Sequence, residues 1–171
     1  MRYFFIVIVL IIISIDLASK YYIEQNISLG QVVIVNEFLM INKIYNKGII
    51  FGIAHSENFY LNILLIIVLT LILLTLIYFF IQDIGKEGNL SRIHFISWAA
   101  LFGGGFSNYI DRILDNKVTD FIVLYYDLFF FPGIFNLADI FITIAFIGFI
   151  IEMLRRNDKK SSIYHVSDNQ Y

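Results

Sequence analysis

Long apolar runs alternate with polar segments along the chain and predict four membrane-spanning helices. The runs cover about residues 4–23, 59–81, 93–112 and 134–154. A helix needs about 20 apolar residues to cross the hydrocarbon core of a bilayer. The run at 59–81 meets this length alone, whereas the other three meet it by including polar residues near one end. We therefore expect an all-α membrane protein with four transmembrane helices, forming a single domain over residues 1–156, and a polar cytoplasmic tail over 157–171.

Two segments between these runs have a different pattern. Residues 31–53 are rich in β-branched and aromatic side chains, with turn signals near Asn36 and Gly48, which predicts a small extracytoplasmic β element on the membrane surface. Residues 121–135 are aromatic and interrupted by Pro132. This composition favours an interfacial helix or lid at the level of the lipid headgroups. Ordinary interfacial anchoring explains the second segment equally well.

Composition supports the membrane class and excludes other classes. Of the 171 residues, 59% are apolar and only 15% are charged, which lies far from the balance of soluble domains. A net charge of −2 argues against a nucleic-acid partner. Because the chain has no cysteine, disulfides, cysteine metal sites and a thiol nucleophile are excluded.

The distribution of Lys and Arg predicts the orientation in the membrane. Four spans place both termini and the 82–92 loop on one side, which carries seven of these residues against five on the other side. Positive residues near span ends favour the cytoplasm, so we expect both termini to be cytoplasmic. The first run could instead be a cleaved signal peptide, but Asp16 and Lys20 occupy the region where cleavage would occur.

The polar residues within or beside the apolar runs are expected at one membrane face, opposite the termini. They are Asp16, Lys20, Asn46, Asn108, Asn136 and Asp139. An acid at the bilayer centre costs roughly 2.5–3.5 kcal/mol on insertion scales, so such residues usually face a protein interior and mark function. The topology therefore predicts a functional site at this face.

Spacing along the helices groups these residues further. Asp16 and Lys20 are an i, i+4 pair, and Asn108, Asp111 and Arg112 share a helix face, on which Asp115 follows. The first pair could also be a snorkelling ion pair at a span end. For Asp111 we favour a structural ion pair with Arg112 that holds the helix end.

Carboxylates in an apolar, partly wet site suggest three chemistries. Two carboxylates can share one proton, so that one acts as a base and the other as an acid on a water molecule. Alternatively, several aspartates could hold Mg²⁺ for transfer of a lipid headgroup. As a third possibility, the acids could relay protons in a small transporter. The residues alone leave these alternatives open.

Four motifs in order along the chain resemble those of the lipoprotein signal peptidases, or type II signal peptidases. Residues 16–20 (DLASK) resemble D-x-x-x-K, and residues 46–52 (NKGIIFG) resemble N-x-G-x-x-F. Residues 103–121 resemble a glycine pair followed by N-x-x-D-R and V-x-D-F, and residues 135–139 (FNLAD) resemble F-N-x-A-D. Ser107 departs from the pattern, which commonly has glycine there.

The resemblance implies an aspartyl endopeptidase that removes signal peptides from diacylglyceryl-modified prolipoproteins, cutting before the lipidated cysteine. The catalytic pair would be Asp120 and Asp139, with no metal and no other cofactor. Its partners would be the prolipoprotein substrate and membrane lipids, and we expect a monomer. The protein would lie in the bacterial cytoplasmic membrane with its active site at the outer face.

The resemblance also assigns supporting roles at this site. Residues that would bind or orient the substrate and the acids are Asn46, Asn108, Arg112, Asn136, Asp16 and Lys20. Asp111 would be structural. We therefore expect these residues to lie at one site in the folded chain.

Overall fold

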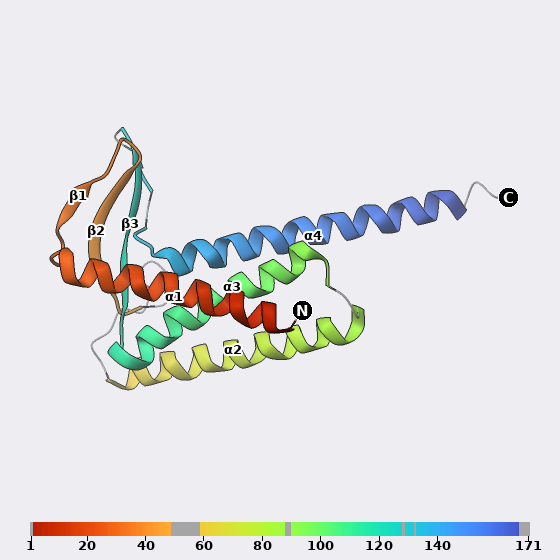
Figure 1. Ribbon diagram of the computed structural model, residues 1–171, viewed down its shortest axis with the longest axis horizontal. Helices are drawn as coiled ribbons and strands as arrows, with labels where there is room; N and C mark the ends of the chain where they lie inside the picture. The colour runs from red at the N-terminus through yellow and green to blue at the C-terminus, as the bar shows by residue number, and fades with distance from the viewer. Residues whose placement is uncertain (1, 49–58, 88–89, 128, 132, 168–171) are drawn as a thin grey trace.

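The computed structural model describes residues 2–48, 59–87, 90–127, 129–131 and 133–167. In chain order the elements are α1 (Arg2–Asn26), β1 (Val32–Ile34), β2 (Leu39–Asn46), α2 (Phe59–Glu87), α3 (Arg92–Asp115), β3 (Val118–Tyr126), β4 (Phe129–Phe130) and α4 (Leu137–Ser167). The long helices lie side by side and the sheet projects from one end of the bundle (Figure 1). We call this the sheet end.

Three of the four predicted spans meet the requirements for crossing a membrane by length and composition. They lie in α1, α2 and α4, at Tyr3–Asn26, Tyr60–Gly85 and Leu137–Asn157. Helix α3 has 24 residues, but the polar residues of its last turns make it less apolar. The fourth span therefore stays a prediction. Many apolar side chains of α1, α2 and α4 point outward, including Leu10, Leu71 and Phe146, as a lipid environment favours.

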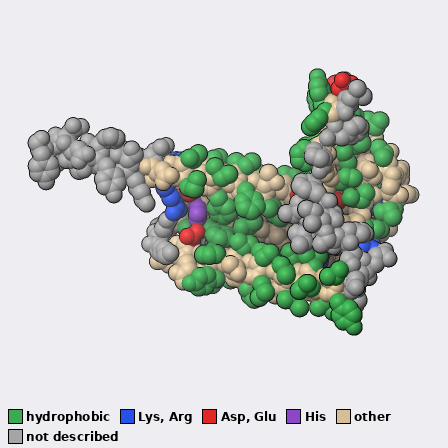
Figure 2. Space-filling view, turned by 180° about the vertical axis from the view of Figure 1, so that it is seen from behind, with side chains coloured by type: hydrophobic (Ala, Val, Ile, Leu, Met, Phe, Trp, Pro, Cys, Tyr) green, Lys and Arg blue, Asp and Glu red, His purple; other side chains and the backbone are tan. Residues whose placement is uncertain are grey.

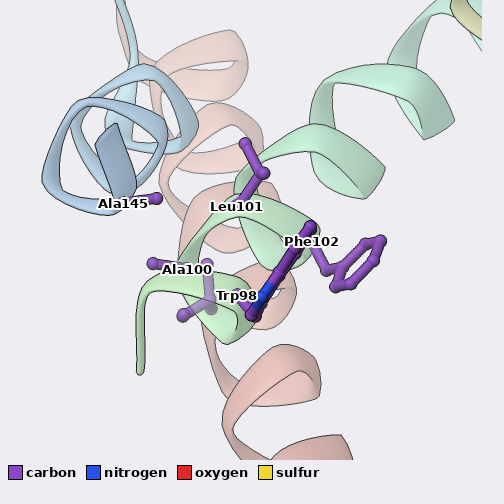
Figure 3. Packing of buried hydrophobic residues seen from close by; sticks show 6 residues of the cluster. Trp98, Ala100, Leu101, Phe102 and Ala145 are labelled. Carbon is purple, nitrogen blue, oxygen red and sulfur yellow. The ribbon is translucent and has the colours of Figure 1, made fainter. Parts of the chain in front are cut away.

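Helix α3 lies at the centre of the bundle, where small residues allow close helix packing. A Cβ atom at Gly104 would come 2.5 Å from the carbonyl oxygen of Ala138, and one at Gly103 would come 2.6 Å from the Ile12 side chain. Figure 3 shows the adjoining cluster, in which Ala145 of α4 lies beside Ala100 of α3. Trp98, Leu101 and Phe102 are the other buried residues that α3 contributes to this core.

The strands form an antiparallel sheet in the order β1-β2-β3-β4. The predicted β element is thus confirmed over the described part of residues 31–53; residues 49–53 lie outside the described residues. The predicted interfacial helix is wrong where β3 runs through residues 121–126. Its β-branched and aromatic residues suit a pleated surface, and β2 supplies hydrogen-bonding partners for its backbone. The lid stays a prediction, and Pro132 lies outside the described residues.

The sheet is fastened to α1 by an apolar and a polar contact. Ile23 of α1 packs with Phe121 and Ile122 of β3 in a buried cluster. Next to it, the Glu24 carboxylate accepts hydrogen bonds from Thr119 Oγ1 at 2.7 Å and from Lys43 Nζ at 3.2 Å. These contacts fix β3 against the bundle. At the opposite end, α4 continues to Ser167 through most of the predicted polar tail.

Candidate active site

Asp120 reaches the site because the chain turns sharply between α3 and β3. Helix α3 ends at Asp115 and is capped by Asn116, which has a left-handed conformation (φ 54°) and donates its backbone N–H to the carbonyl of Arg112. Asparagine tolerates this conformation better than most residues. Two residues later β3 begins, and it carries Asp120, which is only 2% exposed.

Asp139 reaches the same place at the start of α4. Phe135 pairs with Ile122 of β3 through backbone hydrogen bonds of 2.7 and 3.1 Å, so the next residue, Asn136, lies beside β3. Asn136 then caps α4: its Oδ1 accepts the N–H of Asp139 at 3.0 Å, and Asp139 Oδ2 accepts the N–H of Asn136 at 3.2 Å. This reciprocal pair is a capping box, and it fixes the carboxylate of Asp139 at the helix terminus.

Asn136 also joins the two acids. Its Nδ2 donates to Asp120 Oδ1 at 2.6 Å, while its backbone N–H donates to Asp139 Oδ2. The side chain is fully buried. Both carboxylates therefore lie within hydrogen-bonding distance of a single residue, although 19 positions separate them in the sequence.

Two further asparagines hold one acid each. Asn108 Nδ2 donates to Asp139 Oδ1 at 2.9 Å, and Asn46 Nδ2 donates to Asp120 Oδ2 at 2.9 Å. The second contact follows from strand register. Asn46 lies opposite Val118, so it is diagonal to Asp120 on the same face of the sheet, and such neighbours are within reach of each other.

Lys20 is the centre of a separate group of charges in the same network. Its Nζ lies 2.6 Å from Asp16 Oδ2 and 2.6 Å from Asp111 Oδ2, and it donates to Asn108 Oδ1 at 2.7 Å. Asp16 is fully buried and Lys20 is 4% exposed, so the alternative of a snorkelling pair is wrong. The described partner of Asp111 is Lys20, whereas the sequence suggested Arg112.

Asp16 connects three helices. In addition to Lys20, its Oδ2 accepts a hydrogen bond from Ser107 Oγ of α3 at 2.7 Å. Its Oδ1 accepts the backbone N–H of Ala138 at 2.8 Å. The first turn of α4 has backbone N–H groups without partners in the helix, and Asp16 satisfies one of them. The role of Ser107 was not predictable from its position, which is marked only by a departure from the family pattern.

Arg112 is buried beside the acids and braces the loop after β2. Its Nη2 donates to the carbonyl of Gly48 at 2.8 Å, and its Nη1 donates to the carbonyl of Asn108 at 3.3 Å. Asp115, which shares the helix face in the sequence, is exposed. The structure thus brings together every predicted site residue.

The environment of Asp120 favours retention of a proton. Burial raises the pKa of its carboxyl group from 3.8 to about 6. The hydrogen bond from Asn46 acts in the opposite direction, and the charge of Asp139 raises the pKa further. An apolar surrounding and a nearby like charge both disfavour the ionised form, which is what an acid that shares a proton with its neighbour requires.

The matches to known proteins agree with this geometry. The sequence model described as "Signal peptidase (SPase) II" matches residues 8–155. The chain belongs to the signal peptidase II family. It is 34% identical to a lipoprotein signal peptidase of Bartonella henselae over 94% of each chain, and 34% identical to one of Pelagibacter ubique over 94% of this chain and 93% of the other.

Solved structures show the same similarity. A chain described as a bacterial membrane enzyme superposes with a TM-score of 0.75 at 30% identity, covering 91% of this chain and 90% of the other. Membership of the signal peptidase II family makes this protein an aspartic peptidase. The family is one of peptidases, so the transferase and the transporter that the residues alone left open have no support from these matches.

The acids border a long groove of about 1530 Å³. Its walls are α2 and α4, its floor is α3, and β3 closes it at the sheet end. Apolar side chains cover most of the face that contains it (Figure 2). Asn46, Asn108, Arg112, Asp120 and Asp139 all line it. Among the described residues, no group of three His, Asp or Glu side chains is placed to hold a metal ion.

Proposed function

We propose that this protein removes signal peptides from diacylglyceryl-modified prolipoproteins, using a water molecule activated between Asp120 and Asp139. Membership of the signal peptidase II family supports the removal of signal peptides from prolipoproteins. The observation that carries the catalytic assignment is the double contact of Asn136, which holds the buried carboxylate of Asp120 and the half-buried carboxylate of Asp139 at one point of the groove.

In the proposed reaction one carboxyl group is ionised and the other is protonated. The ionised group takes a proton from water, which attacks the carbonyl carbon of the scissile bond, while the protonated group donates to the carbonyl oxygen. The group that took the proton from water then donates it to the amide nitrogen as the C–N bond breaks, and the former carbonyl oxygen returns its proton to the other carboxylate as the carboxyl product forms. The raised pKa of Asp120 favours retention of one proton by the pair at rest.

The neighbouring polar residues position the pair. Asn108 and Asn136 fix the two carboxylates by donating to them. Asn46 does the same from the sheet, and Arg112 braces the segment after Asn46 through Gly48. Lys20 and Asp16 orient Asn108 and the first turn of α4. Asp111 has a structural role as the second acid on Lys20.

The groove suits a substrate that enters from the membrane. We place α3 as the fourth span, with both termini in the cytoplasm and the sheet end at the outer face, as the distribution of positive residues predicts. The acyl chains of the substrate would lie against the apolar walls near the acids. The protein would act as a monomer.

A cleavage assay tests this function. Purified protein in lipid bilayers is given a prolipoprotein with the diacylglyceryl group and the same prolipoprotein without it. We expect a product with the lipidated cysteine at its N-terminus, identified by mass spectrometry, from the modified substrate only. Asp120→Asn and Asp139→Asn should each abolish the product.

The matched control is Asp115→Asn, which removes an exposed acid at the same end of α3 and should retain activity. Substantial cleavage by either single variant of the pair would refute the catalytic assignment. Loss of activity with EDTA, restored by Mg²⁺, would instead point to metal chemistry.

A further inference from the structure

The groove has a second polar end, far from the acids of the active site. There it is lined by Asp83 of α2 and by His94 and Trp98 of α3. His94 and Arg112 lie on the same helix and both border the groove, so at ~1.5 Å per residue its two ends are about 27 Å apart. In Figure 2 a histidine (purple) lies beside an acidic side chain (red) at the end away from the sheet.

The carboxylate of Asp83 is held in place but remains accessible. Its Oδ2 lies 2.7 Å from His94 Nε2 and accepts the indole N–H of Trp98 at 3.1 Å. The Asp83 side chain is 32% exposed, against 12% for His94. Both fixed contacts use the same oxygen, so the acid is oriented by α3 while part of it faces the groove.

Other charges at this end are arranged differently. Glu152 of α4 pairs with Arg156 at 3.0 Å and accepts a hydrogen bond from Ser91 at 2.7 Å. These three residues and Arg155 line a separate small hollow. Of the acids that border the main groove in the described part of the chain, Asp83 is the one at this end; the others are Asp120 and Asp139.

This pattern of charge and apolar surface matches that of a signal peptide. Such a peptide has a positively charged N-terminal region, then an apolar region of about 7–15 residues, then the cleavage site. As a helix the apolar region is about 10–22 Å long. With the cleavage site at Asp120 and Asp139, the apolar region would follow the groove and bring the positive region to its other end.

We infer that Asp83 is a binding site for the positively charged N-terminal region of the signal peptide. The inference rests on the proposed function, because it requires a signal peptide in the groove. Asp83 is too far from the acids to act on the reaction itself. Its contribution should therefore appear in KM and leave kcat unchanged.

The test varies the charge of the substrate's N-terminal region and the charge at Asp83. Two diacylglyceryl-modified prolipoproteins are compared that differ only in the N-terminal region, which carries Lys and Arg in one and Gln at the same positions in the other. With the wild-type protein in bilayers, we expect KM to be about three- to fivefold lower for the positive substrate, the range of a partly exposed ion pair. Asp83→Asn should bring the ratio of the two KM values close to one.

Two further variants separate a specific contact from bulk charge. Glu152→Gln removes one negative charge at the same end but outside the main groove, and it should keep the wild-type ratio. Asp83→Lys should reverse the preference toward a substrate with Glu in its N-terminal region. Each ratio compares two substrates on one variant, so partial loss of folded protein cancels.

Three results would overturn the inference: equal KM values on the wild type, an unchanged ratio in Asp83→Asn, or an equal loss of the ratio in Glu152→Gln. Failure of the wild type to cleave either substrate is a different result. It would refute the proposed function, and the inference would fall with it.

Discussion

Two groups of carboxylates lie in one polar network at the sheet end, and they are held by different kinds of partner. Asp16 and Asp111 contact the ammonium group of Lys20, each at 2.6 Å. Asp120 and Asp139 accept hydrogen bonds from asparagine amides and from a backbone N–H. A cation at contact distance offsets the charge of an acid directly, whereas neutral donors hold a carboxylate in position without offsetting its charge.

The difference separates a structural group from the proposed catalytic pair. The ammonium of Lys20 offsets part of the charge of Asp16 and Asp111, and the contacts of this group join α1, α3 and α4. The asparagines fix Asp120 and Asp139 in position without neutralising them, so a proton can remain in the pair near neutral pH. We expect substitutions in the proposed catalytic pair mainly to lower activity, and substitutions in the Lys20 group mainly to lower stability.

The largest effect on activity should come from Asp120→Asn and Asp139→Asn. Each removes a proton-transferring group, and loss of such a group costs at least about 10²–10⁴-fold in rate. Each substitution presents an amide N–H₂ to a donor that contacts the carboxylate, but it also removes a charge from an apolar site, so the two effects oppose each other and the free energy of unfolding should change little. Cleavage assays and thermal unfolding in the same detergent measure both quantities. A variant that loses both activity and folding would show that the acids also hold the fold.

The largest effect on stability should come from Asp16→Asn. The substitution leaves the ammonium of Lys20 with less compensation and presents an amide N–H₂ to the donors Lys20 and Ser107. Breaking a buried ion pair by removing one partner costs about 3–5 kcal/mol. Ser107→Ala removes only one hydrogen bond and is the control, with an expected loss of about 1 kcal/mol. Equal losses in the two variants, measured by denaturant unfolding, would contradict the assigned importance of the ion pair.

Helix spacing made the Lys20 group partly predictable. The i, i+4 relation of Asp16 and Lys20 placed them on one face, and the structure confirms their contact. Membrane topology also predicted that Asn108, Asn136 and Asp139 would meet. These predictions depend on local periodicity and on the alternation of spans, both of which are visible in one sequence.

The sheet side of the site was less predictable because it depends on pairing between distant segments. Val118–Tyr126 could be assigned to a strand only once β2 was known as its partner, and the contact of Asn46 with Asp120 depends on the register between them. By contrast, the capping box of Asn136 and Asp139 is a local signal that can be read from the spacing of the two residues. The role of Ser107 could not be read, since it requires α1 and α3 to be in contact.

A smaller effect is expected in the titration of Asp120. Its folded pKa of about 6 lies above the ordinary 3.8, so the folded state binds more protons between these values. The contribution of this group to stability should therefore fall as pH rises from about 4 to 6. Asn46→Ala removes a donor to the carboxylate and should raise the pKa above that of the wild type.

The matched variant for the titration is Asp139→Asn, which removes a negative charge close to Asp120 and should lower its pKa. Carboxyl ¹³C NMR of the protein labelled at aspartate measures both shifts. If the two variants moved the pKa in the same direction, the causes assigned to Asn46 and Asp139 would be wrong.

The smallest effect should come from Asp111→Asn. Asp111 is the second acid that contacts Lys20, and its side chain is 16% exposed. Lys20 contacts the residues around the catalytic pair through its hydrogen bond to Asn108, which does not involve Asp111. After the substitution Lys20 retains Asp16, so we expect a loss of only about 1 kcal/mol of unfolding free energy and a kcat within a factor of two to three of the wild type. A large fall in kcat with intact folding would mean that Asp111 acts on the reacting acids through Lys20, and the distinction between the two groups of carboxylates would then have to be given up.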